Sequence, residues 1–204
     1  MIHLITGMTA VGKTTSLIAM KNMKTGDGEN IITPIRMITT RPRRNGETNE
    51  EYDFVTPERY EELRDHLLTD ISFTRVDGTY RYGLLTPNMF DPDNDDEIYV
   101  AVIDPANAAK LKEEFGTQAV VHYIIAPTKL RRERFLSRYD NAEERKEGFK
   151  EWARREQTDT YDFITSGFME ETVDYIINTD ESNTVEDITN SVLNSILNAE
   201  MENI

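Results

Sequence analysis

Cysteine is absent from the sequence, and no run of about 18 apolar residues occurs in it. Without cysteine there can be no disulfide, no thiolate catalysis and no cysteine-ligated zinc site. Without a long apolar run we expect no membrane-spanning helix and no membrane partner. The first residues also lack the charged leader and apolar stretch of a signal peptide, so we expect a soluble, cytoplasmic protein.

Histidine and tryptophan are scarce, with three histidines and one tryptophan in 204 residues. His3, His66 and His122 are scattered over a predicted strand, helix and strand, so a histidine-ligated metal site is not expected. Trp152 falls in a predicted helix, where packing in the core or a lid is a more natural role than base stacking.

Positive side chains are also fewer than negative ones, and the formal net charge is -15. Such a chain repels a phosphate backbone on average, which argues against a nucleic-acid polymer as partner. Nine of the 23 Lys and Arg residues nevertheless fall in two short clusters: Arg36, Arg41, Arg43 and Arg44, then Lys129, Arg131, Arg132, Arg134 and Arg138. This pattern favours a small, highly charged anionic ligand, although the second cluster could equally be a solvated helix face.

Strands alternate with helices along most of the chain. Short apolar runs predict buried strands, and 3.6-residue periodicity predicts helices between them. The strands are expected at 2–6, 98–103, 119–125 and 175–178, and the helices at 14–23, 57–68, 106–115, 129–139, 142–166 and 185–199. This order predicts a single α/β domain with a parallel sheet covered by helices on both faces.

The stretch from about 36 to 90 interrupts this alternation. Residues 31–39 are expected to be extended, and Pro34 makes this segment irregular or places it at a sheet edge. Two further strands, 71–76 and 79–82, flank Asp77-Gly78, a favoured hairpin turn. We interpret this stretch as an inserted acceptor-binding subdomain in a core made of 1–35, 97–127 and 170–204.

A phosphate-binding motif follows the first predicted strand and opens the first helix. Residues 7–14 fit G-x-x-x-x-G-K-[ST]. Glycines allow a tight turn whose N–H groups point inward as an anion nest, and the helix directs its positive end to the same place. Lys13 is expected to reach the phosphates of ATP, and Thr14 to ligate Mg²⁺. The predicted nucleotide-binding residues of this segment are Gly7, Thr9, Ala10, Val11, Gly12, Lys13, Thr14 and Thr15.

A basic turn supplies a second candidate anion site. Residues 39–47 read T-T-R-P-R-R-N-G-E and are followed by Tyr52-Asp53-Phe54-Val55. Arg41 and Arg44, three residues apart, could clamp one phosphate with charge-assisted hydrogen bonds, or the turn could carry no ligand.

Together with the phosphate loop, this turn resembles the guanylate kinase family. That family has a P-loop followed by T-T-R-x-x-R-x-G-E, then Y-x-F-V, then a Y-G pair, which here is Tyr82-Gly83. The similarity continues through Val102-Ile103-Asp104, through residues 124–127 leading into Arg134 and Arg138, and to residues 174–178. It therefore extends over nearly the whole chain.

The resemblance implies a nucleoside monophosphate kinase that uses ATP and Mg²⁺. Arg41, Arg44, Tyr52, Tyr82 and Gly83 would hold the acceptor, and Asp104 would lie near it. A helical lid at about 128–166 would carry the catalytic cations. The remaining residues that the resemblance assigns are Arg134 and Arg138, which with Lys13 would stabilise the transferred phosphoryl group, and Asn178, near the adenine.

The residues that read guanine in that family are not matched. The segment before the Y-G pair, Ser72-Phe73-Thr74, has no carboxylate, and Leu84 follows Gly83 where the family has serine. Buried hydrogen bonds give strong discrimination between substrates, so their loss leaves the base open. GMP or dGMP is the default acceptor. The alternatives are a kinase of a phosphorylated sugar such as ribose bisphosphate, and a non-catalytic binding module.

Overall fold

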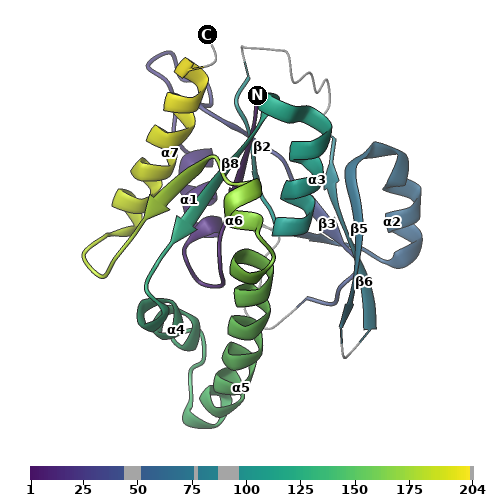
Figure 1. Cartoon of the computed structure of the whole chain (residues 1–204), viewed down its shortest axis with the longest axis vertical. Coiled ribbons are helices and arrows are strands. Elements are labelled where there is room, and N and C mark those ends of the chain that lie inside the picture. The colour runs from purple at the N-terminus through teal and green to yellow at the C-terminus, as the bar shows by residue number, and fades with distance from the viewer. Residues whose placement is uncertain (44–51, 76–77, 87–96, 203–204) are drawn as a thin grey trace.

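The computed structural model of the chain describes residues 1–43, 52–75, 78–86 and 97–202 (Figure 1). It contains one sheet of five parallel strands. In order across the sheet these are β2 (Thr33–Pro34), β7 (Tyr99–Val102), β1 (Ile2–Thr6), β8 (Ala119–Ile125) and β9 (Tyr175–Asn178). The expectation of an α/β fold is confirmed, and β2, with Pro34, lies at the predicted sheet edge.

Helices cover both faces of this sheet. Helices α1 (Lys13–Lys21) and α7 (Val185–Glu202) pack against each other on one face, and α3 (Pro105–Phe115) covers the other (Figure 1). Every residue of β1 and β7 is buried, as expected for strands sandwiched between two helical layers.

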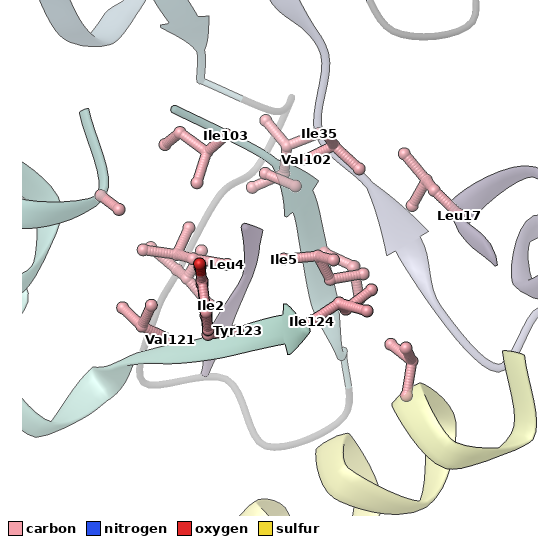
Figure 2. Close-up of a cluster of buried hydrophobic side chains, with 14 of the residues drawn as sticks. Ile2, Leu4, Ile5, Leu17, Ile35, Val102, Ile103, Val121, Tyr123 and Ile124 are labelled. Carbon is pink, nitrogen blue, oxygen red and sulfur yellow. The ribbon is translucent and has the colours of Figure 1, made fainter. Parts of the chain in front are cut away.

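The main core lies on the sheet between these helical layers. Figure 2 shows Leu4, Ile5 and Ile124 from neighbouring strands, with Leu17 of α1 approaching from a helix. Ile2, Leu4, Ile5 and Ile124 are fully buried. This packing fixes the carboxyl ends of β1, β7 and β8 relative to one another, and the candidate site lies at those ends.

A second, smaller sheet is built from the segment that interrupts the alternation. Its strands, in order, are β4 (Tyr52–Phe54), β3 (Met37–Thr39), β6 (Gly78–Leu85) and β5 (Leu67–Arg75). Only β3 and β4 pair in parallel. Helix α2 (Pro57–Leu63) begins at its Thr56 cap and buries Tyr60.

Two further helices lie together beyond the end of the main sheet (Figure 1). They are α4 (Thr128–Leu136) and α5 (Ala142–Asp159). A π-helical turn, Thr160–Thr165, continues α5 and is followed by the short α6 (Phe168–Glu171). None of the helices in the described part of the chain is long and apolar enough to cross a membrane.

The largest differences from the predicted helices are at the ends of two of them. The helix expected at 57–68 ends at Leu63, and after a 3₁₀ turn Leu67 and Leu68 begin β5. These leucines fit a helical period, but pairing with β6 outweighs that local preference. The helix expected at 142–166 is α-helical only to Asp159 and then widens into the π turn.

Candidate active site

A cavity of about 1310 Å³ opens between the phosphate loop, the second sheet and α5. It is lined from three directions by side chains of different chemistry. The loop and α1 contribute Gly7, Thr9, Ala10, Gly12, Lys13, Thr14 and Thr15, and the second sheet contributes Arg41, Tyr52, Phe54, Phe73, Thr74 and Tyr82. Further charged groups come from Asp104, just after β7, from Arg138, Arg154, Arg155, Asp159 and Asp162 on the α4–α5 side, and from Glu171 at the end of α6.

The phosphate loop turns through backbone conformations that favour glycine. Gly7 has φ 146° and Gly12 has φ 109°. A Cβ on Gly7 would lie 2.6 Å from the carbonyl oxygen of Ile124, so no side chain fits there. Gly12 is the N-cap residue of α1, which brings the positive end of that helix to the cavity wall.

Lys13 is held by the loop itself. Its Nζ donates to the carbonyl oxygen of Gly7 at 2.7 Å and to that of Met8 at 3.2 Å. Thr14 and Thr15 follow on the first turn of α1 and line the cavity. The loop therefore has an ammonium group, several hydroxyls and a helix N-terminus in one place, which is the donor set of a polyphosphate site.

The facing wall brings together the predicted acceptor residues Arg41, Tyr52 and Tyr82. Arg41 is buried, with its guanidinium carbon 5.7 Å from the ring centre of Tyr52. The rings of Tyr52 and Tyr82 meet edge to face at 6.0 Å, and Phe73 meets Tyr82 in the same way at 5.3 Å. The hydroxyl of Tyr82 is buried and has no hydrogen-bond partner among the described residues, so this wall carries an unused donor as well as the buried cation of Arg41.

Asp104 lies where β7 ends, next to β1 in the sheet. It is the N-cap residue of α3: its carboxylate accepts from the backbone N–H of Asn107 at 3.0 Å and from the side-chain amide of Asn107 at 2.6 Å. Burial raises the pKa of Asp104, and the bonds from Asn107 partly offset that rise.

Helix α5 presents two arginines to the cavity that are tied to one carboxylate. Arg154 donates to Glu151 at 2.7 Å through both Nε and Nη2, and Arg155 donates to the same carboxylate at 2.8 Å. Burial alone would raise the pKa of Glu151, but these hydrogen bonds outweigh it and lower the pKa to about 2. Arg138, after the end of α4, lines the cavity as well.

Sequence reasoning missed several cavity residues on this helix. Arg155, Thr158, Asp159 and Asp162 all line the cavity, and their three- and four-residue spacing places them along one helical face. That spacing could have identified these residues from the sequence as one face of a helix. Arg154 also lines the cavity, whereas Lys150, four residues earlier on α5, is exposed and paired with Glu147.

Four of the predicted site residues do not line the cavity. Val11 is buried, and Arg134 approaches the carbonyl oxygen of Val11 at 3.5 Å from outside the loop. Gly83 packs against β5, where a Cβ would lie 2.8 Å from the carbonyl oxygen of Thr69. Asn178 is exposed at the end of β9. Arg44 lies outside the described residues.

The glycine-rich loop between a central parallel strand and its helix, with helices on both faces of the sheet, defines a P-loop kinase fold. No family model matches the sequence. No curated protein matches it either.

Among solved structures, a guanylate kinase from Anaplasma phagocytophilum is similar to this chain. The two share 19% identity at a TM-score of 0.59, and the match covers 98% of this chain and 86% of that one. An uncharacterized protein from Eubacterium ventriosum matches with 12% identity and a TM-score of 0.49, covering 97% of this chain and 98% of that one. The chain therefore has a guanylate-kinase-like fold.

Proposed function

We propose that this protein is a nucleoside monophosphate kinase, which transfers the γ-phosphate of ATP to a (deoxy)nucleoside monophosphate. One observation carries the proposal. The donor set of the phosphate loop and the cluster of Arg41, Tyr52 and Tyr82 line one and the same cavity. Two anion sites that share a cavity suit a reaction in which phosphate passes from one ligand to the other.

The acceptor wall fits a phosphate attached to a flat ring. The unpartnered hydroxyl of Tyr82 is a donor that an acceptor's phosphate oxygen would satisfy, and Arg41 supplies charge beside it. Phe54 and Phe73 add aromatic surface to the same wall, where a nucleobase can stack or lie edge-on.

The remaining cavity residues would stabilise the transfer. Lys13 would exchange its loop carbonyls for phosphate oxygens, and Arg138, Arg154 and Arg155 would neutralise charge on the moving phosphoryl group. Helix α5 would exclude water, so that ATP is not simply hydrolysed. No side chain needs to form a covalent intermediate.

The cavity also fits a magnesium ion that enters with the nucleotide. Thr14 presents a hydroxyl beside Lys13 at the cavity wall. Within the described residues there is no group of three or more His, Asp or Glu side chains placed to hold a metal. Thr14 and the phosphates of ATP would therefore hold Mg²⁺, which would neutralise charge on those phosphates when bound.

The test is ADP production from ATP and Mg²⁺ over a panel of acceptors. The panel contains GMP, dGMP, AMP, CMP, UMP, dTMP and ribose bisphosphate, and Lys13→Ala is the control. We expect turnover of at least one nucleotide and its loss in the control. If no nucleotide is turned over by a protein that still binds ATP, the proposal is wrong, and if ribose bisphosphate is not turned over either, a non-catalytic binding module takes its place.

A phosphorylated sugar is the second candidate acceptor. It is favoured by the positions where the guanylate kinase family reads guanine, because Phe73 and Thr74 line the cavity here without a carboxylate. The Thr74 hydroxyl is bonded to that of Thr79 at 3.0 Å. Turnover of ribose bisphosphate, without turnover of any of the nucleotides, would establish that the acceptor is a phosphorylated sugar.

A further inference from the structure

The phosphate loop already binds an anion that belongs to the protein. The backbone N–H of Thr9 donates to Oδ2 of Asp159 at 2.5 Å, although 150 residues separate the two. Thr9 lies within the glycine-rich loop, whose N–H groups form the nest for phosphate oxygens. A carboxylate oxygen of α5 therefore occupies the kind of position that a phosphate oxygen takes in such a loop.

A second contact holds α5 to the same residue. Arg131, buried on α4, approaches the carbonyl oxygen of Thr9 at 3.4 Å and donates to Glu156 of α5 at 2.7 Å. Glu156 and Asp159 are three residues apart and so lie on the same side of the helix. Thr9 is thus tied to α5 directly through its N–H, and through Arg131 at its carbonyl.

The main cation of the loop is also turned inward in this arrangement. Lys13 donates to the carbonyl oxygens of Gly7 and Met8, and Asp162, three residues after Asp159, adds another carboxylate to the cavity lining. An incoming polyphosphate would compete with Asp159 for the Thr9 N–H and be repelled by its charge. Both effects end when Asp159 moves away.

The helix has a fixed point just beyond Asp159. The π-helical turn begins at Thr160, and its Phe163 is buried. The ring centre of Phe163 lies 5.3 Å from that of Tyr123 and 5.6 Å from that of Phe168. Turns of this kind often mark functional sites in helices. A small rotation of α5 about this anchor would withdraw Asp159 from the loop, and would move Arg154 and Arg155 with it.

We propose that Asp159 is an internal ligand of the phosphate loop, which the phosphates of ATP must displace, so that nucleotide binding is coupled to movement of α5. Asp159 thereby lowers the affinity for ATP. When phosphate occupies the loop, Asp159 is displaced, and the arginines of α5 move with the helix. The proposal rests on the proposed function for the identity of the nucleotide. The contact itself and its competition with phosphate do not depend on turnover.

The experiment compares Asp159→Asn with Asp162→Asn, which removes the same charge from the same cavity. Calorimetry in Mg²⁺ measures the dissociation constants of ATP, of tripolyphosphate and of adenosine. We expect Asp159→Asn to bind ATP and tripolyphosphate about tenfold more tightly than the wild type, because a charged acceptor no longer competes. Adenosine should bind equally well to both, and Asp162→Asn should show a much smaller gain.

The single tryptophan gives a second readout that needs no label. Trp152 lies on α5 with its ring 5.3 Å from the Arg131 guanidinium, so its fluorescence reports movement of this helix. We expect tripolyphosphate to change the Trp152 emission of the wild type, and Asp159→Asn to show part of that change without ligand. A melting curve checks that each variant is folded.

The outcomes separate this proposal from the proposed function. Unchanged or weaker tripolyphosphate binding by folded Asp159→Asn, or an equal gain in Asp162→Asn, would overturn the displacement of Asp159 even if the wild type phosphorylates nucleotides. Tighter binding with no turnover of any acceptor would support the displacement while refuting the kinase.

Discussion

The hydroxyl of Tyr82 is the most specific single-residue probe of the acceptor wall, because it is buried and has no hydrogen-bond partner in the part of the chain that the structure describes. Tyr82→Phe should leave the free energy of unfolding unchanged or slightly higher, since no hydrogen bond is lost. If this hydroxyl binds phosphate, the KM for the acceptor should rise about tenfold. Denaturant unfolding and initial-rate kinetics measure the two effects.

Tyr60→Phe is the matched control. Tyr60, on α2, is also buried, but its hydroxyl donates to Asp70 of β5 at 3.0 Å. Its loss should cost about 1 kcal/mol of stability and leave the acceptor KM unchanged. The assignment of Tyr82 to phosphate would be refuted if both variants lost stability and neither altered KM.

Gly83 is explained by packing between β6 and β5. A Cβ there would lie 2.6 Å from Cδ1 of Leu67 and 2.8 Å from the carbonyl oxygen of Thr69. Gly83→Ala should therefore destabilise the fold by about 1–3 kcal/mol. Gly26→Ala, where a Cβ meets nothing within 4 Å, should change stability little. Equal urea midpoints for the two variants would contradict this explanation.

Cavity residues that belong to a local sequence motif were predictable, and contacts that depend on distant packing were not. The loop motif identified Lys13 and Thr14, and the T-T-R turn identified Arg41; all three line the cavity. Nothing near Asp159 in the sequence indicates that its carboxylate meets Thr9. That contact exists because α5 packs across the loop, which only the folded chain determines.

At the scale of elements, a partly buried ion pair joins α4 to α5, and its arginine also reaches the Thr9 carbonyl oxygen of the loop. The side chain of Arg131 is 3% exposed and that of Glu156 26%. Arg131→Met keeps apolar contact with Trp152 but leaves Glu156 without its cation, so we expect a loss of about 3 kcal/mol in urea unfolding. The same experiment reports on how firmly α5 is held over the cavity.

Lys150→Met supplies the comparison on α5 itself. Lys150 and Glu147 form an ion pair whose side chains are both more than 70% exposed. Such pairs contribute little in water, so the urea midpoint should hardly move. A loss as large as that of Arg131→Met would mean that burial does not govern these pairs.

Element types were predicted better than element ends. The parallel strands at 98–103 and 119–125 were recognisable as continuous apolar runs and appear as β7 and β8. The extended segment 31–39 was predicted as one piece, but it divides into β2 and β3, which belong to different sheets. Strand pairing is a long-range choice, and no local pattern in this segment marks the division.

At the scale of the whole molecule, a buried histidine pair links the first strand to the last helix. His3 Nδ1 and His122 Nε2 are 2.9 Å apart, and His3 Nε2 lies 2.7 Å from Glu200. On its other side, His122 Nδ1 lies 2.8 Å from the hydroxyl oxygen of Ser195. This chain of bonds ties β1, β8 and α7 together far from the cavity.

His122 should make the folding free energy depend on pH. Burial first, then the charges of His3 and Lys112, lower its pKa from 6.5 to about 3. The unfolded chain therefore binds a proton that the folded chain refuses, and stability should fall as pH drops from about 6.5 toward 3. The slope from this group approaches about 1.4 kcal/mol per pH unit. Urea unfolding between pH 6.5 and 5 measures it before most carboxylates titrate.

Two variants isolate the contribution of His122. His122→Gln should lose this part of the slope, whereas His66→Gln should keep it, because His66 is exposed on the 3₁₀ turn before β5. A wild-type slope that survives in His122→Gln would assign the pH dependence to other groups.

The division between β2 and β3 has a mechanical consequence. The N–H of Ile35 donates to Val100 in the main sheet, while the carbonyl of the next residue, Arg36, accepts from Leu85 in the second sheet. Where β2 passes into β3, the backbone torsions of Ile35 and Arg36 therefore form the joint between the two sheets. Arg41 lies five residues further on, about 16 Å away in extended chain. A turn of about 10° at this joint would carry Arg41 through about 3 Å, roughly the length of one hydrogen bond.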